Sequence, residues 1–323
     1  MSKIFNCFPF FNELDILDIK FAQEYQHVDY FVISESTKDF MGRPKALMFS
    51  ENMNRYAQYL DKVIHLVVDD MPDSSDPFER EYHQRHSLLR IASQAADEDV
   101  FIISDADEIL REEAIETIRN LNGIAVFDMS MFQFYINLRQ SPSGWKACYA
   151  ASNRFLKCIE HISKFRWDRN AMVAVLDGGG IALELPDAGW HFTHLGGIEA
   201  LKIKFNSYSH ANDPWPRLMK NGNNLYKHIV AGGIVGNLKE RAEFIPISYP
   251  YYPLRINDNQ SEYLGKGFIK DPYVALRELQ GLYKQALDEV ARIFRNNENP
   301  LDLLYGLPAQ NYAWMADIAL DDQ

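Results

Sequence analysis

The chain is poor in cysteine, has no excess of basic residues and contains no long apolar run, and each shortage excludes a class of protein. Cys7, Cys148 and Cys158 are odd in number and lack the spacing of metal ligands, so we expect neither a disulfide framework nor a cysteine-bound metal. The 33 basic and 45 acidic residues give a net charge of −12, and an acidic surface repels nucleic acid and anionic membranes. We therefore expect no nucleic-acid partner.

The N-terminus also lacks the apolar length of a transmembrane segment and the layout of a signal peptide. Together with the cysteine content, this predicts a soluble protein in a reducing, cytoplasmic compartment. What the chain does have is material for a large core, because 47% of its 323 residues are hydrophobic and 13% are aromatic. Such a composition is typical of one large globular domain, or of one domain with an added part.

The first third of the chain alternates strand-like and helical patterns. The strand-like apolar runs lie at residues 4–8, 30–34, 63–68 and 100–103. The helical patterns between them lie at residues 14–25, 50–60 and 78–96. This alternation predicts an α/β fold with a parallel sheet covered by helices.

The rest of the chain is more antiparallel in character. Three glycines at residues 178–180 separate a strand-like run at residues 173–176 from the next one, so we expect a hairpin turn there. A helix that starts near residue 271 has a broad apolar stripe, which predicts either packing on the main domain or an oligomer contact. We expect a main domain over residues 1–264 and, packed on it, a C-terminal helical extension over residues 265–323.

The most informative stretch is residues 100–108, where a predicted buried strand ends in carboxylates. Where that strand breaks into a turn, Asp105 and Asp107 can converge on one divalent cation. Their hard oxygen ligands suit Mg²⁺ or Mn²⁺, and such an ion can bridge the phosphates of a nucleotide-activated donor. For an isolated Asp-x-Asp the alternative is a solvated turn. Glu108 is either a group that supports the site or a helix N-terminal carboxylate.

Polar residues also follow the other predicted strands at the same edge of the sheet. Asn12 and Glu13 come after the first strand, and Glu35 and Ser36 come after the second. Ligands of parallel sheets bind beyond the carboxyl ends of the strands, although helix capping explains any single one of these residues equally well. Arg85 interrupts the apolar face of the next helix. Either its guanidinium contacts a phosphate or ribose, or its aliphatic stem packs on the protein while the guanidinium reaches solvent.

Several ordered blocks of the sequence resemble glycosyltransferase family 17: NELDILD at residues 12–18, FVISES at 31–36, DVFIISDADEI at 99–109 and AGWH at 188–191. The resemblance implies a GT-A-type nucleotide-sugar-binding fold, with a mostly parallel, Rossmann-like sheet flanked by helices. It also implies an inverting β-1,4-N-acetylglucosaminyltransferase-like activity that moves the sugar from UDP-GlcNAc to a glycan acceptor, with Mn²⁺ or Mg²⁺ as cofactor.

The resemblance assigns roles to the candidate residues on the donor side. Asp105 and Asp107 are expected to hold the cation and the diphosphate, and Arg85 to contact the nucleotide. His191 is expected as a further metal ligand, with His194 and His210 as rivals and a neutral core histidine as the alternative for each. The groups expected around the nucleoside are Asn12, Glu13, Glu35 and Ser36.

On the acceptor side, Asp187 is the expected general base because it precedes the Gly189-Trp190-His191 segment, and Glu184 and Asp213 compete with it. Flat aromatic faces bind sugar rings, so the expected acceptor platforms are Trp190, Tyr251 and Tyr252, with core packing as the alternative.

Other functions remain open at this point. The enzyme could use another nucleotide sugar to build a surface polysaccharide or a viral or bacterial glycan. Functions of a different class are a metal-dependent phosphohydrolase, which also uses paired aspartates at a strand end, and a carbohydrate-binding protein without turnover.

Overall fold

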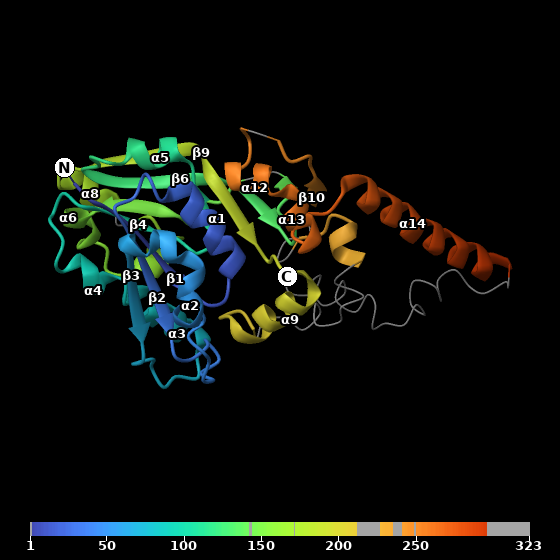
Figure 1. Ribbon diagram of the computed structural model, residues 1–323, viewed down its shortest axis with the longest axis horizontal. Coiled ribbons are helices and arrows are strands. Elements are labelled where there is room, and N and C mark those ends of the chain that lie inside the picture. Colours follow the sequence, from blue (N-terminus) through green and yellow to red (C-terminus); the bar gives the residue numbers. More distant parts are fainter. Residues whose placement is uncertain are drawn as a thin grey trace.

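The computed structural model describes residues 2–141, 144–170, 172–211, 227–234, 241–248 and 250–295. Within them a curled sheet has the strand order β10-β7-β6-β8-β4-β1-β2-β3, and β9 pairs with both β5 and β6 (Figure 1). The strands are β1 (Ile4–Phe10), β2 (Tyr30–Ser36), β3 (Val63–Val68), β4 (Val100–Ile103), β5 (Glu108–Leu110), β6 (Gly123–Gln133), β7 (Leu138–Ser141), β8 (Tyr149–Ser152), β9 (Ile181–Thr193) and β10 (Arg241–Phe244).

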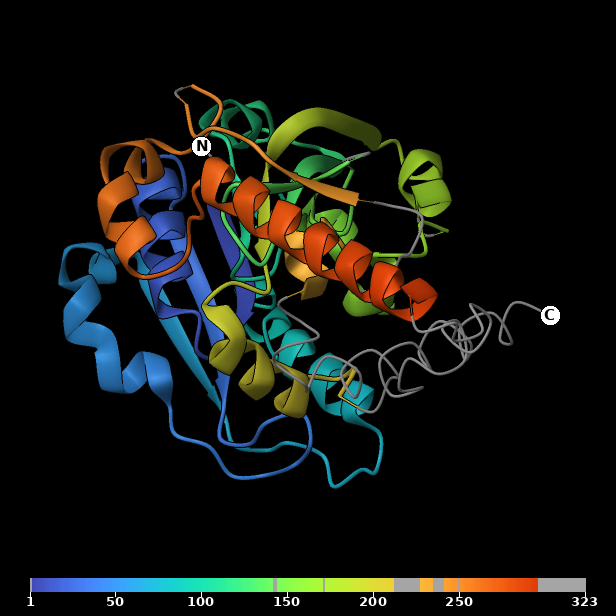
Figure 2. The same cartoon turned by 90° about the vertical axis from the view of Figure 1, so that its right-hand side faces the viewer.

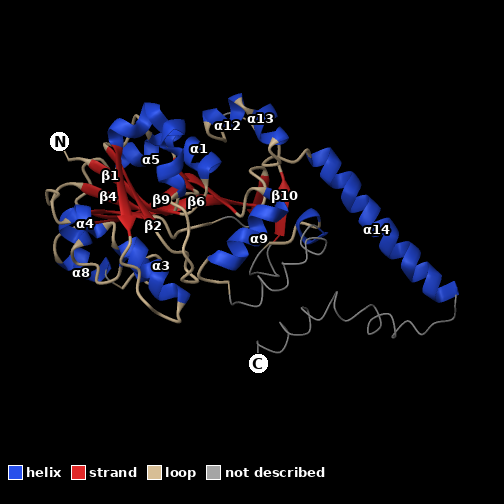
Figure 3. Cartoon of the chain, turned by 60° about the horizontal axis from the view of Figure 1, so that its bottom comes forward, coloured by secondary structure: helices blue, strands red, loops and turns tan. Residues whose placement is uncertain are grey.

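Helices connect the strands and lie on both sides of the sheet (Figure 3). They are α1 (Leu14–Glu24), α2 (Met48–Asn52), the 3-10 helix η1 (Met53–Lys62), α3 (Pro77–His86), α4 (Leu89–Ala92), α5 (Glu112–Thr117), α6 (Asn153–Leu156), α7 (Ile162–Phe165), α8 (Met172–Asp177), α9 (Gly197–Ser207), α12 (Leu254–Asp258), α13 (Gln260–Gly265) and α14 (Pro272–Arg295).

The N-terminal part of the sheet is parallel. Strand β1 lies between β2 and β4, β3 lies outside β2, and all of these pairs are parallel. Beyond β4 the pairs β4–β8 and β8–β6 are antiparallel, but the long pair β6–β9 is again parallel. Most paired residues therefore lie in parallel pairings, and the predicted α/β class with a mostly parallel sheet is confirmed.

Each face of the parallel strands is buried because alternate side chains point in opposite directions. On β1, Ile4 and Phe8 pack on one face with Leu17 and Phe21 of α1. Cys7 of the same strand packs on the other face, in a cluster that also includes residues of α4, α6, α7 and α8. Helix layers on both faces leave the carboxyl ends of the strands as the place where loops can form a site.

Three predicted elements differ from the structure. The helix expected over residues 50–60 is divided between α2 and the 3-10 helix η1. The helix expected over residues 78–96 is split into α3 and α4, and it begins as Asp76 accepts a hydrogen bond from the backbone N–H of Phe78 at 2.9 Å. The hairpin around the three glycines is wrong, because residues 172–177 form the helix α8 rather than a strand. A short apolar run does not separate helix from strand by its periodicity, and here Val175 is buried against Phe155 and its neighbours.

The C-terminal helices differ in how they pack on the rest of the structure. Helix α12 lies beside α1, where Arg255 pairs with Asp18 at 2.5 Å (Figure 2). Helix α14 instead extends away from the rest of the structure (Figure 1). Its first turns are held by the buried Ala275 and by an ion pair of Lys270 with Glu278 at 2.9 Å. Further along, its apolar stripe is exposed, so the oligomer contact stays a prediction. No helix in the described ranges has the length and apolar character to cross a bilayer.

Candidate active site

A pocket of about 310 Å³ opens at the carboxyl ends of the parallel strands. Its floor comes from the ends of β1 and β4, and its walls come from the loop after β2, from α3, from the turn after α7, from the end of β9 and from α9. Of the residues predicted from the sequence, those that line it are Glu13, Arg85, Asp105, Asp107, His191, His194 and His210.

The Asp-x-Asp loop between β4 and β5 rests on a buried polar network. Lys20 of α1 is fully buried, and its ammonium group donates to the backbone carbonyl of Glu108 and lies 3.4 Å from Ser104 Oγ. Ser104 Oγ donates to Asn6 at 2.9 Å, and Asn6 donates to Glu24 at 2.7 Å. Buried polar groups cost free energy unless they are paired, so this network fixes the loop from below.

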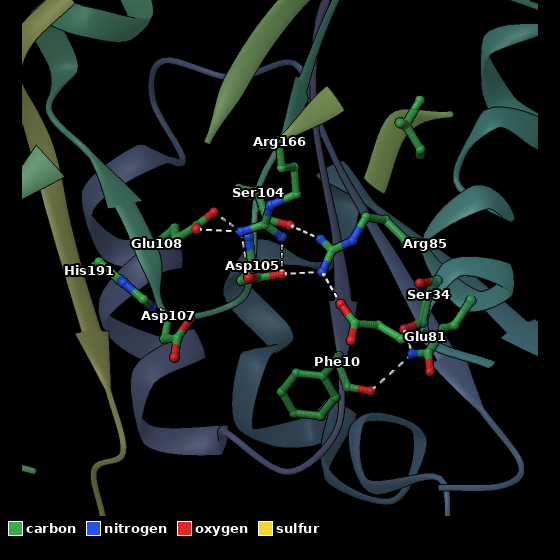
Figure 4. A network of polar contacts seen from close by, with 12 residues as sticks. Phe10, Ser34, Glu81, Arg85, Ser104, Asp105, Asp107, Glu108, Arg166 and His191 are labelled. Carbon is green, nitrogen blue, oxygen red and sulfur yellow. Dashed lines mark hydrogen bonds and ion pairs between the residues drawn. The ribbon is translucent and has the colours of Figure 1, made fainter. Parts of the chain in front are cut away.

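Asp105 is held by two arginines (Figure 4). Arg166 donates to both carboxylate oxygens at 2.8 and 2.7 Å, and Arg85 contacts Oδ1 at 2.7 Å. Arg166 also donates to Glu108 Oε1 at 2.6 Å, and Glu108 accepts the backbone N–H of Asp105 at 2.7 Å. Burial opposes ionisation of Asp105, but the two guanidinium groups outweigh it and hold the pKa of Asp105 well below its usual range.

Asp107 points instead toward a histidine. The register of β5 against β9 pairs Glu108 with His191, which places His191 Nε2 3.4 Å from Asp107 Oδ1. The ammonium group of Lys204 on α9 lies 3.7 Å from Asp107 Oδ2. Burial raises the pKa of Asp107, but His191 and Lys204 overcome this effect and lower it to about 2. This carboxylate is therefore ionised at neutral pH.

The Asp107–His191 pair fits a divalent cation better than Asp105 does. Both groups line the pocket, and carboxylate oxygen with imidazole nitrogen suits Mn²⁺, whereas both oxygens of Asp105 are engaged by arginines. The described residues contain no cluster of three or more metal-ligating side chains. Cations at nucleotide sites are commonly bound by one or two protein side chains together with the substrate's phosphates, so a pair is sufficient.

The predicted nucleoside group divides into pocket and structural residues. Glu13 lines the pocket and accepts the backbone N–H groups of Phe11 and Asn12 at 3.1 and 3.0 Å, while Asn12 itself is exposed and outside the lining. Burial raises the pKa of Glu13. Glu35 is buried away from the pocket, where it accepts the N–H of Phe49 at the start of α2, and Ser36 forms a local turn with Lys38.

The residues predicted for the acceptor side also lie outside the lining. Trp190 is buried, donates to the backbone carbonyl of Tyr251 at 2.8 Å and packs under the guanidinium of Arg111 at 4.2 Å. Tyr252 is buried in the same cluster, which matches the core-packing alternative. Asp187 is 66% exposed and pairs with Arg111 at 3.2 Å. Glu184 pairs with a surface lysine, and Asp213 lies outside the described residues.

The pocket contains residues that the sequence patterns did not single out: Arg166, Lys204, Trp145 and Trp167. Trp145 donates from Nε1 to Glu108 Oε1 at 2.5 Å and stacks on His191 with 4.4 Å between ring centroids. Trp145, Arg166 and Trp167 come from loops and turns without a regular pattern, and Lys204 comes from helix α9. Only the folded chain brings them to the carboxylates.

A pocket lined with charged side chains at the carboxyl ends of parallel strands is where α/β proteins bind their ligands. The family comparison makes this specific. The model of glycosyltransferase family 17 matches residues 1–254, and the chain belongs to this family. Together with the sheet described above, family membership confirms the predicted GT-A-type fold class.

The relatives found by sequence are much longer than this chain. Beta-1,4-mannosyl-glycoprotein 4-beta-N-acetylglucosaminyltransferase of Rattus norvegicus is 24% identical over 307 residues, covering 84% of this chain and 55% of that protein. The Homo sapiens protein of the same name is 25% identical over 242 residues, covering 66% of this chain and 44% of that protein. The chain thus spans about half the length of the curated relatives that it matches.

Solved structures resemble the chain only loosely. Glucosyl-3-phosphoglycerate synthase from Mycobacterium tuberculosis, in complex with Mn²⁺, UDP and glucosyl-3-phosphoglycerate, superposes with a TM-score of 0.35 and 11% identity over 79% of this chain and 92% of that one. A putative glucose-1-phosphate thymidylyltransferase from Bacillus anthracis gives a TM-score of 0.37 and 10% identity over 59% and 88%. Superpositions this loose assign no ligand and no residue role to the present chain.

Proposed function

We propose that this chain is a metal-dependent inverting glycosyltransferase that transfers N-acetylglucosamine from UDP-GlcNAc, in β linkage, to a glycan acceptor. The observation that carries the proposal is the Asp107–His191 pair beside the arginine-bound Asp105, in one pocket of a family 17 glycosyltransferase. The choice of donor sugar follows the names of the rat and human relatives.

The charge of the pocket supports the need for a cation. Its described lining carries five carboxylates and five lysine or arginine side chains, so it has almost no net charge with histidine neutral. A nucleoside diphosphate would bring uncompensated negative charge into this partly buried space. A divalent cation held by Asp107 and His191 would neutralise that charge as the diphosphate leaves. The ten lining groups are Glu13, Asp39, Glu81, Asp105, Asp107, Lys38, Lys45, Arg85, Arg166 and Lys204.

The chain's own cationic groups have a positioning role. Asp105 keeps Arg85 and Arg166 side by side, and the Nε atoms of both arginines are buried without a hydrogen-bond partner in the described residues. Preorganised cationic groups stabilise developing negative charge without having to reorganise during the reaction. We therefore assign Arg85, Arg166 and Lys204 to stabilisation of the diphosphate, and Asp105 to holding the two arginines.

Inverting transfer also requires a base for the acceptor hydroxyl, and Glu13 is our choice in place of Asp187. Asp187 lies outside the pocket, and the lining carboxylates Asp39 and Glu81 are paired with arginines. Glu13 lines the pocket, and burial raises its pKa, which makes its carboxylate a better proton acceptor near neutral pH.

Calorimetric titration with UDP-GlcNAc, UDP-glucose, UDP-galactose and GDP-mannose, each with Mn²⁺ and with a chelator, tests the proposal. We expect binding of UDP-GlcNAc that is lost when the metal is removed. Tighter binding of a different nucleotide sugar would replace the donor, and equal binding with chelator would remove the metal. Phosphate release without an acceptor would favour the phosphohydrolase. Binding of oligosaccharides but of no nucleotide sugar would favour the carbohydrate-binding protein.

A further inference from the structure

Trp167 stands apart from the other exposed apolar side chains. Its side chain is 68% exposed although it lines the pocket, and no other large apolar side chain that is exposed in the described residues does so. Leaving an indole in water forgoes the free energy that its burial would give. At the mouth of a pocket, that bare surface is available to a ligand.

The indole is also held in place. Trp167 follows Arg166, whose guanidinium is fixed to Asp105 and Glu108. The backbone N–H of Trp167 donates to the backbone carbonyl of Lys164, near the end of α7, at 2.9 Å. Its ring packs edge-on against Trp145, with 5.2 Å between centroids and an interplanar angle of 80°. A rigid aromatic side chain loses little conformational entropy when it binds a ligand.

The position of Trp167 relates it to the reacting centre. Trp145 lies between Trp167 and His191, so two ring contacts, of 5.2 and 4.4 Å, connect the mouth of the pocket to the proposed cation site. In the sheet, β8 and β6 lie on one side of β4, and β1 and β2 lie on the other. Trp145, against which the Trp167 ring packs, pairs with Met129 of β6, so Trp167 lies on the β6 side of β4. The pocket therefore runs from the loop after β2, past the Asp-x-Asp loop, to Trp167.

This order leaves one end of the pocket to each substrate. The crevice at β1 and β2 is where α/β sheets bind nucleotides, and the charged groups after β4 suit the diphosphate. Glu13 interacts electrostatically with Asp107 and Lys204, so it lies beside the diphosphate site, where the two substrates would meet. Resting on the proposed function, we infer that the exposed face of Trp167 binds a pyranose ring of the acceptor glycan. A sugar ring presents C–H groups on its flat faces, which pack on an indole, while its hydroxyl groups stay in water. Trp167 is thus the acceptor platform that Trp190, Tyr251 and Tyr252 do not provide.

The test uses the full chain and three disaccharides as probes: mannobiose, N,N′-diacetylchitobiose and lactose. Each is titrated calorimetrically, with UDP and Mn²⁺ present, into the unaltered chain and into Trp167→Ala, Trp167→Phe and Tyr273→Ala. Tyr273 is the matched control, because it is 77% exposed on α14 and outside the pocket lining. Thermal unfolding of each variant checks its fold, and a second titration measures its affinity for UDP-GlcNAc.

We expect at least one disaccharide to bind the unaltered chain, Trp167→Ala to bind it at least tenfold more weakly, and Trp167→Phe to recover most of the loss. Tyr273→Ala should bind like the unaltered chain, and UDP-GlcNAc affinity should stay within twofold in all variants. Unchanged disaccharide affinity in Trp167→Ala overturns the inference, as does a chain that binds UDP-GlcNAc but none of the disaccharides. Disaccharide binding that is lost in Trp167→Ala, in a protein that binds no UDP-GlcNAc in any form, would refute the proposed function. It would still support Trp167 as a sugar-binding side chain.

Discussion

The two ends of the pocket are lined by different kinds of side chain. Around Asp105 the charged groups are buried and paired with one another, and a second buried network that includes Lys20 lies beneath the loop. Around Trp167 the surface is aromatic and open to solvent. The difference suits the two proposed substrates, because the diphosphate always presents the same charges, whereas an acceptor is recognised through the shape and apolar faces of its sugar rings. Rigidity at one end and exposure at the other would allow acceptor choice to change without disturbing the chemistry.

The contrast between the two ends of the pocket would be wrong if the charged end were not the reaction centre. Asp107→Ala and His191→Ala should each lower turnover by roughly 10²- to 10³-fold, because the cation and the diphosphate would lose a ligand. Steady-state kinetics with Mn²⁺ measures this loss. Glu199→Gln, an exposed carboxylate on α9 that pairs with a lysine, is the control and should keep full activity. Full turnover in Asp107→Ala would place the reaction elsewhere.

Asp105 should differ from Asp107 in its effect on stability. Asp105→Ala leaves Arg85 and Arg166 without their shared counter-charge, which should lower the free energy of unfolding by about 3 kcal/mol and abolish transfer. Urea unfolding measures this change. Asp97→Asn removes a surface pair with Lys157 and should leave the urea midpoint unchanged. An Asp105→Ala chain of normal stability would show that the arginines do not depend on this carboxylate.

A variant of Glu13 distinguishes its proposed role as general base from the nucleoside contact expected from the sequence. Glu13→Gln should lower kcat about 10²-fold, because an amide cannot accept the acceptor's proton, while the calorimetric affinity for UDP-GlcNAc changes less than twofold. A variant that loses donor affinity but keeps kcat at saturating donor would return Glu13 to the nucleoside role expected from the sequence.

Acid should weaken the charged end in particular. The pKa of Asp107 is about 2 in the folded chain, below the value near 3.9 of an unfolded aspartate, so its ionisation stabilises the fold above about pH 4. That contribution, about 2 kcal/mol, is lost as the pH falls from about 4 to 2. Urea unfolding between pH 5 and pH 2.5 should show a steeper loss in the unaltered chain than in Asp107→Asn. Parallel curves would mean that Asp107 gains nothing from His191 and Lys204.

The smallest effect is expected far from the pocket. Leu287 is 68% exposed on α14, so Leu287→Ser should change the free energy of unfolding by less than about 0.5 kcal/mol and leave both substrates' affinities unchanged. Light scattering of this variant also tests the predicted oligomer contact. A fall in molar mass would show that the apolar stripe of α14 is an interface between copies.

The sequence predicted those parts of the site that lie next to a regular element. Asp105 and Asp107 directly follow a buried strand, and Arg85 interrupts a helical stripe, so local patterns were enough to find them. Trp190, which was expected on the acceptor side from the sequence, does not line the pocket that contains His191. Neighbouring residues of a strand point to opposite faces, so a pocket that contains His191 excludes Trp190, which the structure buries in the core.

Residues that enter the site through long-range packing could not be predicted in this way. Arg166 and Trp167 lie in a turn after the four-residue helix α7, and Lys204 reaches Asp107 from α9. Neither segment has a pattern that specifies what it faces. The same limit applies to α8, whose apolar residues fit a strand as well as a helix until Phe155 buries Val175.

The pairing of β5 with β9 has a consequence for synthesis of the chain. A ribosome exposes the Asp-x-Asp loop long before it releases His191, and that histidine reaches Asp107 only when β9 adds between β5 and β6. Contacts between such distant segments carry a large loop-closure entropy and are slow to form. A nascent chain that ends before β9 would therefore carry most of the parallel sheet without the complete pair, and ability to bind the donor would arise as one of the last events in its maturation.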